Sequence, residues 1–113
     1  MNRAGTKAPR RTAQNAATHA FLESLNGGPL SFGQLLSAQR EAEEASVSQF
    51  AARLGISRQH LHQLEGGRKR VSPERAVRFA QLLGQSETFY LQLALQDLAN
   101  DSGIEGHIEV RVA

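Results

Sequence analysis

The sequence predicts an all-α domain of five helices, with a disordered basic tail before it and a short β-strand after it. Five serines between residues 31 and 86 each precede a stretch in which apolar side chains recur every three or four residues, the pattern of a capped amphipathic helix. The chain has 113 residues, 40% of them hydrophobic, which is enough for one domain and too little for two. Near the C-terminus the apolar period changes to two, as in a strand.

The N-terminal part of the chain lacks the signals of a packed element. Residues 1–18 contain no acid and almost no apolar side chain larger than alanine, so we expect a disordered basic tail. Residues 19–30 hold a weak apolar cluster, Phe21, Leu22 and Leu25, followed by Gly-Gly-Pro. This pattern predicts a short helix and a linker.

The first two helices of the domain have clear start signals. Ser31 is followed three residues later by Gln34, a pair that forms a reciprocal capping box, and the helix is expected to run to about Glu44. Ser46 offers the next N-cap, and Gly55 can stop that helix in a left-handed conformation. Their expected buried side chains are Phe32, Leu35, Leu36, Phe50, Ala51 and Leu54.

Three further helices follow after short turns. Ser57 caps a helix that ends at the glycine pair 66–67. Ser72 and Pro73 start the next one, because proline at the first helical position loses no hydrogen bond, and Gly84 ends it. Ser86 caps the last helix.

The last helix is apolar around most of its circumference, with Phe89, Tyr90 and Leu93 among its residues. A surface helix of a small monomer has one polar face, so we expect self-association to bury a second face. The segment after it alternates polar and β-branched residues and includes Ile108 and Val110. An unpartnered strand there would pair with its copy in a dimer or with another protein; a frayed tail is the alternative.

Composition excludes several classes of protein. The chain has no cysteine, which excludes disulfides, thiolate metal sites and a cysteine nucleophile. It has no run near 18 apolar residues and no apolar stretch of a secretory signal at its basic N-terminus, so neither a membrane span nor export is expected. We therefore expect a cytoplasmic protein without a membrane partner.

Charge is concentrated in the middle of the chain although the net charge is only +2. Residues 53–78 carry seven basic and two acidic side chains, whereas the stretches on either side, 31–52 and 79–113, are net acidic. A basic block of this kind indicates a surface that faces a polyanion if its side chains share one face. A solvated helix face is the alternative.

Residues 46–67, SVSQFAARLGISRQHLHQLEGG, resemble the helix-turn-helix of the phage repressor and Cro-like family, also called Xre. The matching positions are the pair Phe50-Ala51, the turn Gly55-Ile56, the inward Leu61 and Leu64, and Glu65 followed by Gly67. The likeness extends over roughly residues 31–96 and departs from the family pattern at Val47, where many members have glutamine. It implies a repressor-like fold, and a HigA-like antitoxin branch of the family is one alternative.

This resemblance gives the expected domain organisation. Residues 31–99 form the repressor-like domain, and 100–113 form the terminal strand and a candidate dimerisation element. In family members an arginine of the first helix pairs with the acid at the end of the third; the matching positions here are Arg40 and Glu65. We expect that pair to be partly buried and structural.

The resemblance also implies which side chains contact DNA. The helix after Ser57 would be the recognition helix in the major groove, with base contacts from Arg58, Gln59, His62 and Gln63, because arginine pairs with guanine and glutamine with adenine. Phosphate contacts would come from Ser46, Ser48, Ser57, Arg68, Lys69 and Arg70. Arg10 and Arg11 could form an arm in the minor groove, or simply part of a solubilising tail.

Other chemistry is poorly supported by the sequence. His60 and His62 are two residues apart, so on a helix they point about 200° apart and cannot chelate one ion. Glu41, Glu43 and Glu44 are interpreted as solvated charge without a base beside them, and neither Gly-Gly pair has the spacing of a phosphate loop. We therefore expect no metal, no cofactor and no enzymatic activity.

Two functions follow from these observations. The first is a homodimeric, sequence-specific transcriptional regulator, a repressor of its own gene, that reads a palindromic operator in double-stranded DNA and is associated with the nucleoid. The second is the antitoxin of a toxin-antitoxin pair, which binds a toxin protein through residues 1–20 or the terminal strand and also represses its operon.

Overall fold

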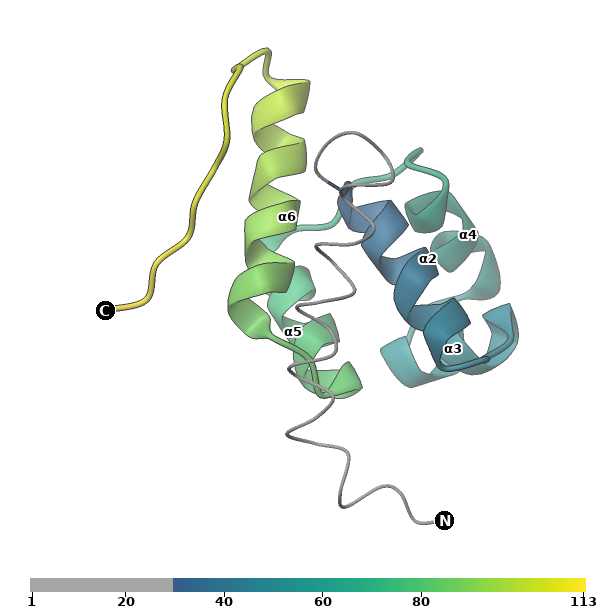
Figure 1. Cartoon of the computed structure of the whole chain (residues 1–113). Coiled ribbons are helices and arrows are strands. Elements are labelled where there is room, and N and C mark those ends of the chain that lie inside the picture. Colours follow the sequence, from purple (N-terminus) through teal and green to yellow (C-terminus); the bar gives the residue numbers. More distant parts are fainter. Residues whose placement is uncertain (1–29) are drawn as a thin grey trace. The chain divides into compact units, whose positions relative to one another are not determined.

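The computed structural model describes residues 30–113, and within that range the chain folds into five helices (Figure 1). They are α2 (Phe32–Ala42), α3 (Val47–Leu54), α4 (Arg58–Glu65), α5 (Pro73–Leu83) and α6 (Glu87–Asp101). The all-α, five-helix part of the prediction is confirmed. The expected basic tail, the short helix before residue 30 and the Arg10-Arg11 arm lie outside the described residues.

Each of these helices begins at the serine that the sequence indicates. The hydroxyl oxygens of Ser31, Ser46, Ser57, Ser72 and Ser86 accept hydrogen bonds from the backbone N–H three residues later, at 3.0 to 3.1 Å. At α2 and α3 a glutamine side chain also accepts from the N–H of the capping serine, which completes a capping box. These bonds satisfy donors that have no partner inside the helix.

The ends of the helices are set by residues in the left-handed region. Gly55 ends α3 with φ 74° and Gly84 ends α5 with φ 67°, where glycine has no steric penalty. Helix α2 ends at Ala42, two residues earlier than expected, because Glu44 adopts φ 55° and the Ala45 N–H bonds back to the Arg40 carbonyl at 3.1 Å.

An aromatic cluster forms the centre of the core. Phe32 of α2 packs edge-on against Tyr90 of α6, with ring centroids 5.6 Å apart, and lies 6.5 Å from the ring of Phe79 of α5. All three are almost fully buried. Because aromatic side chains bury large apolar areas and favour edge-to-face contacts, this cluster fastens α5 and α6 onto the start of α2.

Helices α2 and α4 approach closely because Gly33 has no side chain. A Cβ atom at Gly33 would lie 2.3 Å from the carbonyl oxygen of Leu64 and 3.1 Å from that of Glu65. Both are backbone atoms, so the two helices would have to move apart to accept it. This close approach holds the C-terminal end of α4 against the first turn of α2.

The prediction of a C-terminal β-strand from the alternating pattern is wrong. Residues 104–113 are extended but form no strand in the described chain, and they run beside α6 (Figure 1). Side chains of α6 take up their backbone groups: Gln96 Oε1 accepts from the Ile108 N–H at 2.7 Å, and Gln92 Oε1 accepts from the Val110 N–H at 3.0 Å. Because side-chain oxygens of α6 accept hydrogen bonds from these N–H groups, the segment needs no neighbouring strand to satisfy them.

Most of the apolar surface around α6 is covered by other parts of the same chain. Tyr90 and Leu93 are only 1% and 3% exposed, so neither offers area to a second copy. Phe89 is half-buried, as are Ile108 and Val110 in the segment beside the helix. The extra apolar face therefore reflects packing against both α5 and the chain's own C-terminal segment.

Candidate nucleic-acid interface

Helices α3 and α4 are joined by the three-residue turn Gly55-Ile56-Ser57. The Ile56 N–H bonds to the Ala51 carbonyl at 3.0 Å, and Ala51 is 2% exposed where the two helices pack. A small side chain at that position lets the helix axes come close. The result is a rigid two-helix unit that fixes the direction of α4.

An ion pair holds the far end of α4 against α2. Arg40 Nε lies 2.8 Å from Glu65 Oε2, and Arg40 Nη2 lies 3.0 Å from Glu65 Oε1. The two side chains are 18% and 12% exposed. The hydrogen bond to Glu65 raises the pKa of Arg40. The structure thus brings together the two residues expected to form a structural pair.

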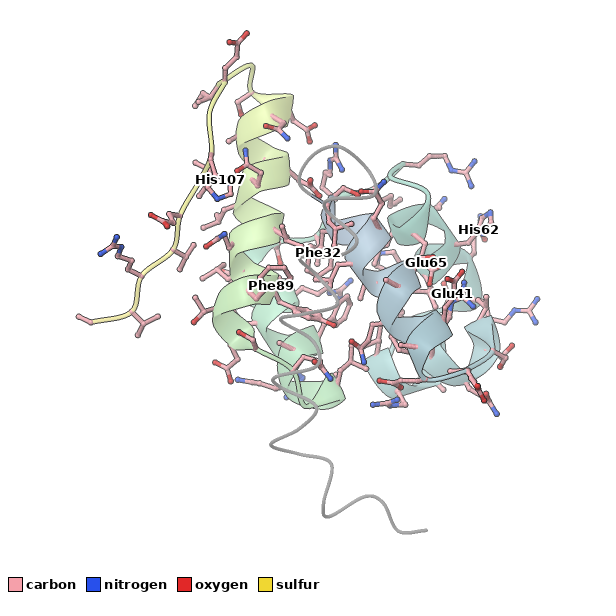
Figure 2. The ribbon with its side chains drawn as sticks, in the orientation of Figure 1. Phe32, Glu41, His62, Glu65, Phe89 and His107 are labelled. Carbon is pink, nitrogen blue, oxygen red and sulfur yellow. The ribbon has the colours of Figure 1, made fainter. Side chains whose placement is uncertain are left out.

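The outward side of α4 is polar and accessible. Arg58, Gln59 and His62 are exposed and Gln63 is half-buried, while Leu61 and Leu64 on the opposite side are buried. Figure 2 shows His62 on the outer side of α4 and Phe32 within the fold. The Arg58 Nη1 group donates to Ser48 Oγ of α3 at 3.3 Å, which holds the guanidinium beside the start of α3.

The basic loop after α4 presents two of its three cations to solvent. The backbone N–H groups of Arg68 and Lys69 both donate to the Gln63 carbonyl, at 2.9 and 3.3 Å, and Gly67 adopts φ 78° to allow this turn. The side chains of Arg68 and Lys69 are exposed and form no ion pair with any residue of the described part. They therefore place two exposed cations directly after the C-terminal end of α4.

Arg70 forms ion pairs with two acidic side chains of α6. Its guanidinium binds the Asp101 carboxylate through two hydrogen bonds of 2.7 and 2.9 Å, and it lies 3.3 Å from Asp97 Oδ2. The hydrogen bond to Asp101 raises the pKa of Arg70, and the same bond lowers the pKa of Asp101. The sequence predicts a phosphate contact at Arg70, as at its two basic neighbours, and gives no sign of this network.

Asp97 connects the same network to the first turn of α2. Its Oδ2 accepts a hydrogen bond from the Phe32 N–H at 3.0 Å, and a carboxylate at a helix N-terminus is also favoured by the helix dipole. Burial raises the pKa of Asp97, opposed by the Phe32 N–H and by Arg70. The residues Arg70, Asp97 and Asp101 thus join the basic loop, α6 and α2 and fix the loop's position.

The three serines expected to meet phosphates lie at helix starts near this surface. Ser46, Ser48 and Ser57 are exposed. The oxygens of Ser46 and Ser57 accept backbone hydrogen bonds, and a hydroxyl that accepts one hydrogen bond can still donate another. Their hydroxyl hydrogens can therefore still be donated to an anion.

His60 and His62 of α4 differ in exposure. His60 is half-buried and His62 is exposed. Burial lowers the pKa of His60, and the charges of Arg75 and Lys69 lower it further. Among residues 30–113 no group of three metal-ligating side chains comes together.

Comparison with known proteins identifies the class of this fold. Residues 31–88 match the family described as a helix-turn-helix domain, and the chain belongs to that family. Such domains place the second helix of the motif in the major groove of DNA. The chain is therefore of the class of DNA-binding regulators. Members of this helix-turn-helix family are typically not enzymes. Neither the curated proteins nor the solved structures gave a match.

No helix in the part of the chain that the structure describes is long and apolar enough to cross a lipid bilayer.

Proposed function

We propose that this protein is a sequence-specific transcriptional regulator of the Xre or Cro-like kind, which reads double-stranded DNA through α4. The observation that carries the proposal is the exposed polar surface made by the start of α4 and the loop after it. Arg58 and Gln59 are exposed on α4, and Arg68 and Lys69 are exposed in the loop after it. The Arg40–Glu65 pair holds the end of α4 that leads into this loop.

In this proposal, base contacts come from Arg58, Gln59, His62 and Gln63. Arginine can donate two hydrogen bonds to guanine O6 and N7, and glutamine can pair with adenine in the same way. The bond from Arg58 to Ser48 limits the freedom of a long side chain before it binds, so less conformational entropy is lost on contact. Arg58 is therefore the residue with the strongest expected effect on sequence preference.

Phosphate contacts are assigned mainly to Arg68 and Lys69, with hydroxyl donors from Ser46, Ser48 and Ser57. Arg70 is proposed to act indirectly, since Asp97 and Asp101 already take up its guanidinium. Replacing Lys69 by alanine should weaken binding to all sequences alike and reduce the salt slope by about one. Replacing Arg70 should instead loosen the fold.

The operator-bound form is proposed to be a homodimer that represses the protein's own gene. One α4 reads only one half-site, and dimers place two such helices about one turn of DNA apart. We assign the dimer surface to the end of α6 and the segment after it, where Leu98 and Ile104 are 36% and 59% exposed and Ile108 and Val110 are half-buried. Residues 31–99 would supply the DNA-binding domain and 100–113 the accessory segment.

A second candidate function is an antitoxin that binds a toxin protein and also represses its own operon. The observation that favours it is the exposure of Ile104 and Val112, 59% and 77%, in a segment beyond the matched family region. A co-purifying toxin in one-to-one ratio, lost when residues 104–113 are deleted, would support this function. Unchanged partner binding after that deletion would contradict the assignment of the segment.

The experiment that tests the first function is binding of the purified protein to a labelled fragment of its own upstream region. Unrelated DNA serves as competitor, at two salt concentrations. We expect binding that survives the competitor and falls with salt. Equal competition by unrelated DNA at both salt concentrations would contradict a sequence-specific autoregulator.

A further inference from the structure

A groove lies between the last turn of α3 and the outer face of α5. Its volume is 670 Å³. We call it the arginine groove and define it by its cationic residues Arg53, Arg75 and Arg78 and its apolar residues Ile56, Phe79 and Leu82. None of these residues belongs to the surface proposed for base or phosphate contacts.

Two of the groove's arginines have no acidic partner in the described part of the chain. Arg53 binds Glu43 and lies over the Phe50 ring, 6.0 Å from its centroid. Arg75 and Arg78 are exposed and form no ion pair with any residue between 30 and 113. They are three residues apart on α5 and so share one face. Glu74 is the one acid among the described residues that line the groove, so the groove has a net positive charge that an anion would offset.

The same face of α5 exposes an apolar side chain. Leu82 follows Arg78 by four residues and is 38% exposed, and Ile56, which lines the same groove, is half-buried. Leu82 is also roughly 13 Å along the helix from its first residue, Pro73, and hence away from the basic loop before α5. A ligand of this groove would bring both negative charge and an apolar group.

That combination favours a protein segment over the alternatives. A DNA backbone supplies charge but only sugar carbons, and no aliphatic side chain, to pack on Leu82. The groove is open rather than enclosed, whereas small-molecule sites bury most of the ligand surface. The chain's own residues 1–29 carry four basic side chains and one acid, so their charge has the same sign as the groove.

We propose that the arginine groove is a docking site for an acidic segment of a partner protein. Carboxylates of that segment bind Arg75 and Arg78, and an apolar side chain between them packs on Leu82. The N-terminal end of α5, with Ser72 at the groove's edge, adds a favourable dipole for the negative segment. A regulator with such a site could contact a second protein while α4 occupies DNA.

The test uses the full chain and random peptides displayed on phage. Selected peptides are synthesised with fluorescein and titrated by fluorescence anisotropy. We expect the enriched peptides to combine several Asp or Glu residues with Leu, Ile or Phe. The Arg75→Gln/Arg78→Gln variant should bind them at least about tenfold more weakly, because hydrogen bonds to charged groups are lost, and Leu82→Ser should bind several-fold more weakly.

Glu74→Gln is the matched control, since Glu74 also lines the groove and its removal should leave peptide binding equal or tighter. Circular dichroism checks that each variant is folded, and the single Gln variants replace the double one if it is not. The proposal is overturned if the enriched peptides are not acidic, or if the double variant binds them as well as wild type. Loss of DNA affinity in the double variant would also overturn it, because the groove would then be a phosphate contact.

Discussion

Replacing Arg40 by alanine should destabilise the fold strongly, because it breaks a mostly buried ion pair. The mutation removes two hydrogen bonds of 2.8 and 3.0 Å and leaves the Glu65 carboxylate, 12% exposed, without its cation. Fully buried pairs cost about 3–5 kcal/mol when one partner is removed, and exposed pairs cost below about 1 kcal/mol. Because this pair is mostly buried, we expect a loss of about 3 kcal/mol.

Urea unfolding followed by circular dichroism measures this loss. With a slope of about 1.5 kcal/mol per molar urea, the unfolding midpoint should fall by about 2 M. Arg53→Ala is the matched control, because its pair with Glu43 is more exposed, 44% at the arginine, and should cost below about 1 kcal/mol. An Arg40→Met/Glu65→Leu variant should recover much of the stability, since no charge is then left unpaired.

An Arg40→Ala variant that is as stable as Arg53→Ala would contradict a structural role of the Arg40–Glu65 pair. A double variant less stable than Arg40→Ala alone would show that the loss does not come from a stranded carboxylate.

Three further predictions concern packing and pH. Gly33→Ala should lower the free energy of unfolding, measured by urea unfolding, by about 1–2 kcal/mol, because its Cβ would lie 2.3 Å from the Leu64 carbonyl oxygen. A gain in stability would show that α2 and α4 do not approach closely at Gly33. Tyr90→Phe should be neutral or stabilise by about 1 kcal/mol, because the buried Tyr90 hydroxyl has no hydrogen-bond partner among the described residues, and a loss above about 1 kcal/mol would contradict this. Arg70 lowers the pKa of Asp101 in the folded state, so the ionised carboxylate stabilises the fold. This stabilisation is fully present above the pKa of Asp101 in the unfolded chain, about 3.9. It is lost as the pH falls through the lower pKa of the folded state. Asp101→Asn should therefore lose less melting temperature than wild type between about pH 5 and pH 2, and an equal loss would show that this ion pair does not couple to folding.

Local signals in the sequence predict the helix starts and the turn correctly. A serine before an apolar-periodic stretch and a glycine in the left-handed region act within a few residues, so Ser57 and Gly55 can be recognised without tertiary information. The resemblance to a known motif pointed to Arg40 and Glu65, which are 25 residues apart.

Features that depend on distant partners were not predictable in this way. Arg70 looks like its neighbour Lys69 in sequence, and only the fold reveals that Asp101, 31 residues later, occupies it. The period-two pattern around Ile108 is that of a strand, but its N–H groups are satisfied by glutamines of α6. The alternation of polar and apolar residues in an extended segment does not reveal whether its N–H groups bond to a neighbouring strand or to side chains of a helix.

The central claim, that α4 reads DNA sequence, is tested most directly by selecting bound duplexes from a pool of random DNA. Wild-type protein should enrich a palindromic motif with half-sites about 10 base pairs apart, and Arg58→Ala should lose preference at one position in each half-site while keeping the rest. Enrichment of no motif by the wild-type protein, or an identical motif with Arg58→Ala, would contradict the assignment of α4 and Arg58 to base recognition.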